Sequence, residues 1–197
     1  MAASSTPGAV RLRPTDWLQA AFDRISAEGV DAIRVEVLAR DLKVSKGSFY
    51  WHFRDRGDLL ERLLADWESR ELGWLEREEG STNAATRWAK LIERTTDPAR
   101  IRHEVALRAW ARADERVARR VVEVDKKRAG LIADVLRDVG FAPSAAESWS
   151  DMVLLICLGW LDRATRDPQY QMANRGLGEL LSEMVLAASA RTTASHR

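Results

Sequence analysis

Apolar residues recur at helical spacing along almost the whole chain, and this periodicity restricts the fold more than any other feature of the sequence. One such stripe, at positions i, i+3, i+4 and i+7, consists of Leu18, Ala21, Phe22 and Ile25. No stretch shows the sustained alternation of apolar and polar residues that is typical of a half-buried strand. The sequence therefore predicts an all-α fold.

Cap and stop residues mark where the N-terminal helices begin and end. We predict a first helix capped by Thr15 and stopped by Gly29, because hydroxyl side chains favour N-caps and glycine favours helix ends. A second helix is expected over residues 35–42. Ser45 and Asp55 each precede a further apolar stripe, so we expect them to cap a short third helix and a long fourth helix.

Helical patterns continue after a polar break at residues 78–83. The expected helices cover about residues 84–95, 99–113, 115–139, 144–166 and 174–191. We predict a three-helix N-terminal domain over residues 14–65, joined by the long fourth helix to a C-terminal helical domain over residues 66–191. The tails, residues 1–13 and 192–197, are small and polar and are expected to be disordered.

The composition excludes several classes of protein. The longest apolar run, residues 152–161, is far shorter than the roughly 20 residues that a bilayer-spanning helix needs. The N-terminus has no apolar segment typical of a signal peptide. The single cysteine, Cys157, lies within the apolar run, which excludes an internal disulfide and indicates an inert core thiol. These features predict a soluble, cytoplasmic protein.

Residues that carry enzyme or metal chemistry do not cluster in the sequence. The three histidines, His52, His103 and His196, lie far apart, whereas a metal site needs several converging ligands. There is no glycine-rich phosphate loop after a strand and no Gly-x-Ser-x-Gly motif. We therefore predict no catalytic residues, no metal and no cofactor, and we do not expect an enzyme.

The segment of residues 44–60 crowds aromatic and basic residues onto a short helix. Phe49 and Phe53 have the i, i+4 spacing of core residues, which leaves the residues between them to face a partner. Residues 43–56 hold four basic residues and one acid, in a chain whose net charge is only +1. Because charges act only over about 8–10 Å in salt, this local patch matters more than the sum.

The two short helices around residue 43 form a helix-turn-helix, a motif whose second helix enters the major groove of DNA. Its N-terminal residues fit that role. A cap at Ser45 leaves backbone N–H groups for a phosphate, Lys46 is cationic, and Gly47 permits close approach.

The following residues add further donors. Ser48 can reach a base or a phosphate. Tyr50, Trp51 and His52 supply O–H and N–H groups, and Arg56 begins the next helix near an expected sugar-phosphate backbone. The alternative is that Tyr50 packs half-buried and that the lysine and arginines are ordinary solvated charges.

The combined pattern resembles the DNA-binding domain of the TetR (tetracycline-repressor-like) family of bacterial transcription regulators. The matching residues are Leu38-Ala39, Val44-Ser45, the run Lys46 to Phe53, Arg56 and Leu59-Leu60. Two positions depart from the family pattern. Lys43 replaces the usual turn glycine, which predicts a non-glycine residue at positive φ. Arg34 replaces a capping threonine, a loss of about 1 kcal/mol, and we expect it to reach a phosphate instead.

The resemblance implies a homodimeric repressor that binds a palindromic double-stranded DNA operator and is released by a small-molecule effector. It assigns the operator contacts to Arg34, Ser45, Lys46, Gly47, Ser48, Tyr50, Trp51, His52 and Arg56. The alternative is a small-molecule-binding helical protein that uses its helix-turn-helix for protein contacts.

The C-terminal domain is expected to enclose the effector, as the family's domains do, and aromatic residues line such cavities well. The lining candidates are Trp88, Leu91, Trp110, Leu131, Val135, Trp149, Met152 and Ile156. The last two helices carry apolar stripes that fit a four-helix dimer interface. Its candidates are Leu154, Leu158, Leu161, Leu177, Leu180, Leu181, Met184 and Val185. The alternative is that both helices only close an intramolecular core.

Overall fold

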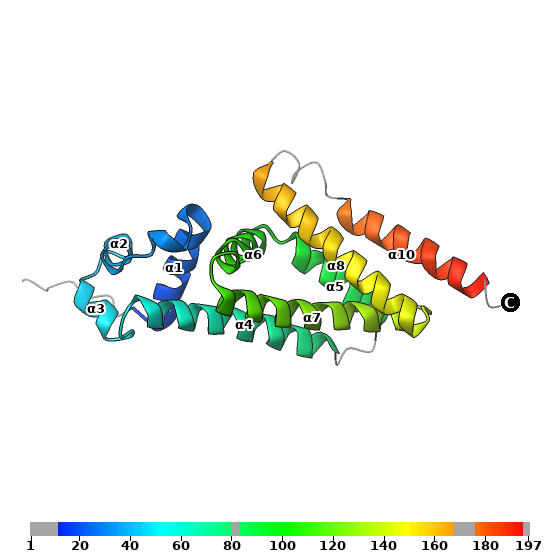
Figure 1. Cartoon of the computed structure of the whole chain (residues 1–197), viewed down its shortest axis with the longest axis horizontal. Coiled ribbons are helices and arrows are strands. Elements are labelled where there is room, and N and C mark those ends of the chain that lie inside the picture. The colour runs from blue at the N-terminus through cyan, green and yellow to red at the C-terminus, as the bar shows by residue number, and fades with distance from the viewer. Residues whose placement is uncertain (1–11, 80–82, 168–175, 195–197) are drawn as a thin grey trace, which may run out of the picture. The chain divides into compact units, whose positions relative to one another are not determined.

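The computed structural model describes residues 12–79, 83–167 and 176–194, and within these ranges every regular element is a helix (Figure 1). The predicted all-α class is therefore confirmed for this part of the chain. Two compact units divide the chain, Met1–Leu64 and Ala65–Arg197, next to the predicted domain boundary. No described helix combines the length and the apolar character needed to cross a membrane.

The N-terminal unit is built from short helices around an aromatic core. Its elements are α1 (Pro14–Glu28), the 3-10 turn η1 (Val30–Ala32), α2 (Val35–Asp41), α3 (Lys46–Tyr50) and the start of α4 (Arg56–Glu79). Phe49 and Phe53 are fully buried, as predicted, and Trp17 meets Phe49 edge-on with ring centroids 5.3 Å apart. Phe49 thus anchors α3 in the core of the N-terminal unit.

The caps of α1 and α4 differ in how well the sequence predicts them. Asp55 caps α4 as expected, since its Oδ1 accepts a hydrogen bond from the backbone N of Asp58 at 2.8 Å. The predicted cap Thr15 is wrong, because α1 begins at Pro14 and its N-cap is Arg13, two residues before Thr15. Proline suits the first helical position, where its missing N–H is not needed.

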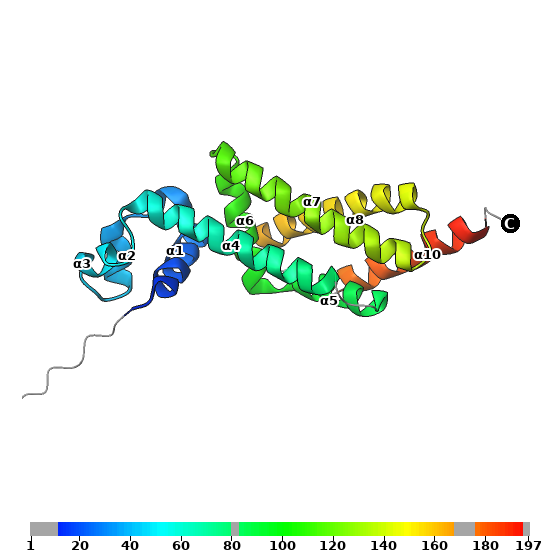
Figure 2. The same cartoon turned by 90° about the horizontal axis from the view of Figure 1, so that it is seen from below.

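The C-terminal unit consists of longer helices. They are α5 (Ala84–Thr96), α6 (Pro98–Ala111), α7 (Glu115–Asp138), α8 (Pro143–Arg166) and α10 (Leu177–Ala194), together with the C-terminal part of α4. Helices α7 and α8 lie side by side (Figures 1 and 2). Helix α10 begins later than predicted and continues to Ala194, into the segment expected to be a tail.

Helix α10 is held against α5 by close packing and one hydrogen bond. Trp88 Nε1 donates to Ser182 Oγ at 2.8 Å. At Gly178 an added Cβ would clash with Cγ2 of Ile92, so the Ile92 side chain packs against the backbone of α10 and leaves no room for a larger residue. The core beneath them includes Leu181 and Cys157, and burial raises the pKa of the Cys157 thiol to about 11. The cysteine is therefore an inert core residue, as predicted.

Candidate nucleic-acid interface and ligand cavity

The turn between α2 and α3 adopts the conformation that the sequence predicts at Lys43. Lys43 has φ 56°, and among the described residues it alone combines a side chain with positive φ. Two backbone bonds close the turn, from Lys43 N to Arg40 O at 3.0 Å and from Val44 N to Ala39 O at 2.9 Å. The turn thus aims α3 across α2, as a helix-turn-helix requires.

Helix α3 presents an exposed aromatic and polar surface. Trp51 is 86% exposed and Tyr50 is 59% exposed, although each carries a large apolar ring. Ser45 is exposed as well, and its hydroxyl makes no cap hydrogen bond, so only its carbonyl anchors α3. Ser48 and His52 are half-buried. Exposed rings together with unused polar groups are typical of a surface that meets a partner.

Gly47 is not required by the domain's own packing. Its φ is not positive, and an added Cβ would meet nothing closer than Ser45 Oγ at 3.6 Å, an ordinary contact. Alanine would moreover be the better helix former by up to about 1 kcal/mol. The glycine therefore leaves room on the outer surface of α3, where another molecule can approach the backbone.

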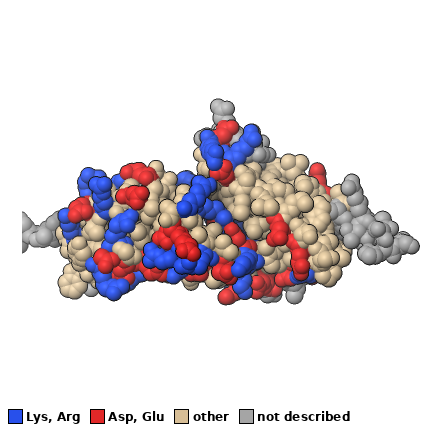
Figure 3. Space-filling view, viewed as in Figure 1, with Lys and Arg blue, Asp and Glu red and all other residues tan. Residues whose placement is uncertain are grey.

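Lys46 lies in an exposed ion pair with Glu36 of α2, with Nζ 2.7 Å from Oε1. The hydrogen bond from Lys46 lowers the pKa of Glu36. Because both side chains are exposed, the pair is weak and Lys46 can exchange Glu36 for a phosphate. In the view of Figure 3, Lys and Arg residues alternate with Asp and Glu residues over the N-terminal unit. A phosphate bound to this unit would therefore be held by a few nearby cations rather than by a uniformly positive surface.

The two predicted arginine contacts occupy different environments. Arg34 is exposed at the N-cap of α2 and makes no side-chain cap bond, in agreement with the loss of the capping threonine. Arg56 instead donates through Nε to Ile33 O at 2.8 Å and through Nη2 to Val30 O at 2.7 Å. Two of its nitrogens thus hold the chain between α1 and α2, a role that the sequence analysis missed.

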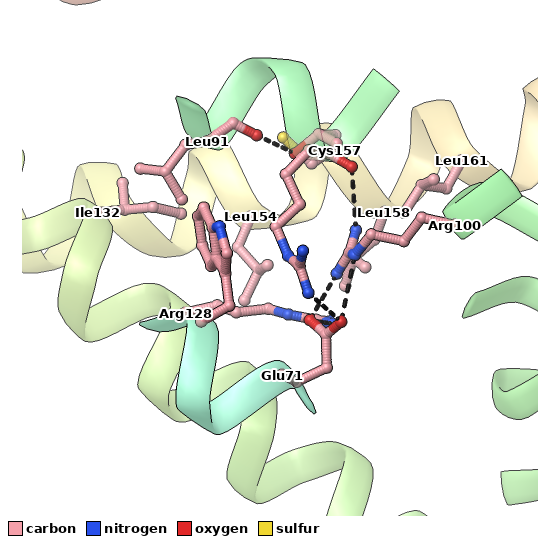
Figure 4. A pocket seen from close by; sticks show the side chains of 12 residues that line it. Glu71, Leu91, Arg100, Arg128, Ile132, Leu154, Cys157, Leu158 and Leu161 are labelled. Atoms are coloured by element: carbon pink, nitrogen blue, oxygen red, sulfur yellow. Dashed lines mark hydrogen bonds and ion pairs between the residues drawn. The ribbon is translucent and has the colours of Figure 1, made fainter. Parts of the chain in front are cut away.

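A cavity of about 50 Å³ lies in the C-terminal unit (Figure 4). One side is charged and the rest is mostly apolar. It is lined by Glu71, Trp74, Leu91, Arg94, Thr95, Arg100, Arg128, Ile132, Leu154, Cys157, Leu158 and Leu161. The volume is several times what one water molecule needs and small for an organic ligand.

The charged side of the cavity belongs to a buried ion cluster. We define the cluster as Glu71, Arg94, Arg100, Glu104, Arg108, Asp125 and Arg128. Figure 4 shows Arg100 and Arg128 converging on the carboxylate of Glu71. Burial raises the pKa of Glu71, but the charges of Arg100 and Arg128 outweigh it and lower the pKa to about 2. Glu71 is therefore an anion at neutral pH.

Glu104 and Arg128 form the innermost pair of the ion cluster. Arg128 Nη1 donates to Glu104 Oε1 at 2.8 Å, and Nη2 donates to Glu71 Oε2 at 2.7 Å. Burial alone would raise the pKa of Glu104, yet Arg128 and its neighbours hold it well below its usual range. Burial lowers the pKa of Arg128, and Glu104 and Glu71 raise it by more.

The structure places one of the eight predicted pocket residues, Leu91, in the lining of this cavity. Met152 is exposed on α8, and Trp149 packs edge-on against Phe141 with centroids 5.9 Å apart. The others lie elsewhere in the body, with Trp88 bonded to Ser182 and with Trp110, Leu131, Val135 and Ile156 buried or half-buried. The prediction favoured aromatic residues, whereas the charged side of the cavity is made by Glu71 and three arginines.

A sequence signal for the charged wall does exist. Glu71 lies four residues after Trp67 and four before Leu75, within the buried stripe of α4. Arg128 likewise follows Val124 by four positions and precedes the buried Leu131 in α7. An ionisable residue at a stripe position must be buried with a partner, because an isolated buried charge is too costly.

The predicted dimer residues fall into three groups. Leu154, Leu158 and Leu161 line the cavity. Leu177, Leu181 and Val185 are buried within the protomer, so they cannot face a second chain. Leu180 and Met184 remain exposed on α10, and α8 exposes Leu155 and Met152. The buried side of each helix packs into the protomer core, and a dimer interface through the exposed residues stays a prediction.

Groups of three or more His, Cys, Asp or Glu residues placed to hold a metal ion do not occur among the described residues.

An all-α chain with an exposed, aromatic α3 behind a tight turn belongs to the class of helix-turn-helix proteins. Residues 18–63 match the sequence model of the bacterial regulatory proteins of the tetR family. The matched segment lies within the N-terminal unit and contains α2, the turn at Lys43 and α3.

Comparisons with known proteins separate the two halves of the chain. The class A tetracycline repressor protein from transposon 1721 of Escherichia coli is 38% identical over 53 residues. This match covers 27% of the chain and about a quarter (24%) of that repressor.

Similarity of fold extends much further than similarity of sequence. A transcriptional regulator from Rhodococcus sp. Rha1 superposes with a TM-score of 0.67 at 20% identity, over 90% of this chain and 97% of that one. A complex of SmeT with triclosan gives a TM-score of 0.66 at 20% identity, over 89% and 90% of the two chains. These structures establish the fold of both units.

Proposed function

We propose that this protein is a ligand-responsive, DNA-binding transcriptional regulator that acts as a homodimer. The observation that carries the proposal is the surface of α3, where Lys46, Tyr50 and Trp51 are exposed around a glycine that the domain's own packing does not need. In the helix-turn-helix motif these N-terminal positions of the second helix meet base edges and phosphates. The family match over residues 18–63 supports the same role.

A homodimer gives each molecule two recognition helices. We infer that it forms through the exposed apolar residues of α8 and α10, with Leu155 68% exposed and Leu180 55% exposed. A twofold axis makes such an interface use the same patch on both chains. The operator is then a near-palindrome whose half-sites are separated by one helical turn of DNA or a multiple of it.

The direction of regulation that fits best is repression relieved by a small molecule. The cavity in the C-terminal unit supports an effector site, and the SmeT fold neighbour holds triclosan. Trp74 and Glu71 in the cavity wall belong to α4, the helix that begins at Arg56. A ligand that binds one state of α4 better than another shifts the population, and full reversal needs about a 10⁴-fold affinity difference.

DNA fragments selected by the purified protein from a random library test this function. Sequencing should give one near-palindromic motif, and fluorescence anisotropy should show its affinity falling steeply as salt rises, because phosphate contacts release counterions. If α3 instead serves protein contacts, no motif is enriched and any residual DNA binding is the same for all sequences. That second outcome would reject the assignment of α3 as a recognition helix.

A further inference from the structure

The cavity of the C-terminal unit has two chemically different sides. Leu91, Ile132 and Leu154 contribute apolar walls from three helices, and Leu158 and Leu161 extend them along α8. The lining also includes Glu71 and three arginines of the ion cluster, Arg94, Arg100 and Arg128. A ligand that fits both sides needs an apolar body and one polar or charged end.

The sign of that end follows from the ion pairs. They join four guanidinium groups, those of Arg94, Arg100, Arg108 and Arg128, with three carboxylates, those of Glu71, Glu104 and Asp125. The cluster therefore has one positive charge more than its carboxylates neutralise. A further cation would add to this excess, whereas an anion would compensate it.

The carboxylate of Glu71 is already shared by three guanidinium groups. Arg94 Nη2 lies 2.6 Å from Oε1, Arg100 Nη2 lies 2.8 Å from Oε2, and Arg128 Nη2 lies 2.7 Å from the same oxygen. A cationic ligand would have to displace one of these contacts to reach Glu71. The internal carboxylate thus does not offer a free acceptor to a positively charged effector.

Arg94 lines the cavity and has one unsatisfied donor. Its Nε is buried and has no hydrogen-bond partner among the described residues. Its guanidinium carbon lies 4.6 Å from the centroid of the Trp74 ring, within the range of a cation–π contact. Burial lowers the pKa of Arg94, and the charge of Arg100 lowers it further, although Glu71 opposes both effects. A second carboxylate would supply the missing acceptor.

We propose that the cavity binds an organic carboxylate, with its anionic end on Arg94 and its apolar body between α5, α7 and α8. This inference rests on the proposed function, because it names the chemical class of the effector for that site. The volume of about 50 Å³ confines the enclosed part of the ligand to a small group. Short aliphatic acids are therefore suitable probes.

Calorimetry on the full-length protein without DNA tests the ligand class. Three probes share one apolar chain and differ only in the end group: hexanoate, hexan-1-ol and hexylammonium. We expect hexanoate to bind at least tenfold more tightly than hexan-1-ol, and hexylammonium not to bind. Equal binding of hexanoate and hexan-1-ol, or tighter binding of hexylammonium, would overturn the proposal.

Arg94→Met tests the residue, because it removes the charge and keeps an apolar side chain of similar length. The variant should lose at least tenfold in hexanoate affinity and keep the affinity for hexan-1-ol. Arg102→Met on α6 is the matched control, since Arg102 is exposed and lies outside the cavity. A purely structural role of Arg94 would weaken both probes together, and that result would reject Arg94 as the anion contact.

Failure of this inference is separable from failure of the proposed function. The binding of hexanoate is measured without DNA, and the binding of selected DNA is measured without hexanoate. A protein that binds its DNA motif but not hexanoate is a regulator with a different ligand class. A protein that binds hexanoate but no DNA motif keeps the carboxylate site and loses the proposed function.

Discussion

Arg128 and Glu104 form a buried ion pair in the centre of the C-terminal unit, with Nη1 2.8 Å from Oε1 and both side chains almost fully enclosed. The same guanidinium reaches Glu71 on α4, so α4, α6 and α7 are joined through one arginine. Removing one member of a buried pair leaves an uncompensated charge and costs about 3–5 kcal/mol. The packing of α4, α6 and α7 therefore depends on the ionisation of the residues in the ion cluster.

Acid should destabilise the protein through Glu71. Its pKa falls from the ordinary value of 4.5 to about 2 in the folded chain, so its contribution to stability is present above pH 4.5. As pH falls from 4.5 through 2 the folded carboxylate becomes protonated and that stability is lost. Urea unfolding at a series of pH values should show this loss in the wild type and a smaller loss in Glu71→Gln.

The control for this pH dependence is Glu93→Gln, which removes an exposed carboxylate on α5. Its stability should follow the wild-type curve. If Glu71→Gln followed that curve too, the carboxylate of Glu71 would not be an anion held by the arginines.

Charge on the exposed side of α8 or α10 should separate the proposed homodimer into monomers. Leu155→Glu and Leu180→Glu place a carboxylate where apolar side chains are exposed in the protomer, so they should yield folded monomers in analytical ultracentrifugation. Val122→Glu is the control, because Val122 is also half-exposed but lies on α7. A charge at Leu181 should instead unfold the C-terminal unit, since that side chain is buried in its core.

Dimers that persist at low micromolar concentration in both Leu155→Glu and Leu180→Glu would remove these helices from the interface. The same conclusion would follow if Val122→Glu alone gave monomers.

Lys46 and Glu36 should have opposite effects on DNA affinity. Lys46→Ala removes one phosphate contact, which should weaken binding and reduce the slope of log affinity against log salt by about 1. Glu36→Gln releases Lys46 from its 2.7 Å pair and removes a repelling charge, so binding should become tighter. Fluorescence anisotropy with the selected DNA, over a salt series, measures both changes.

An equivalent exposed pair elsewhere provides the control for Lys46. Lys126 and Glu123 on α7 are also 2.7 Å apart and exposed. Lys126→Ala should leave the affinity and its salt slope unchanged. Equal losses in Lys46→Ala and Lys126→Ala would indicate an effect of total charge rather than of α3.

Local signals in the sequence predict the parts of the structure that are decided locally. The all-α class, the cap at Asp55 and the core pair Phe49 and Phe53 follow from periodicity and capping. The positive φ of Lys43 follows from comparing one turn residue with a family pattern. Such features depend on neighbours a few positions away, and these can be read directly from the chain.

Features that depend on distant partners are less predictable. Arg56 bonds to carbonyls of Val30 and Ile33, more than 20 residues earlier, and nothing at position 56 itself signals this. The charged wall of the cavity brings together residues of α4, α5, α6 and α7. A charge at the stripe position of Glu71 predicts burial with a partner, but only the packing of the helices selects that partner.

Gly47 offers the most direct test that α3 is a DNA-reading helix. Gly47→Ala fills space that the protein itself leaves open, so the melting temperature should stay the same or rise, as it should in the control Gly130→Ala on α7. Affinity for the selected DNA should fall at least tenfold in Gly47→Ala and remain unchanged in Gly130→Ala. If Gly47→Ala bound that DNA as tightly as Gly130→Ala does, the proposed recognition surface would be contradicted.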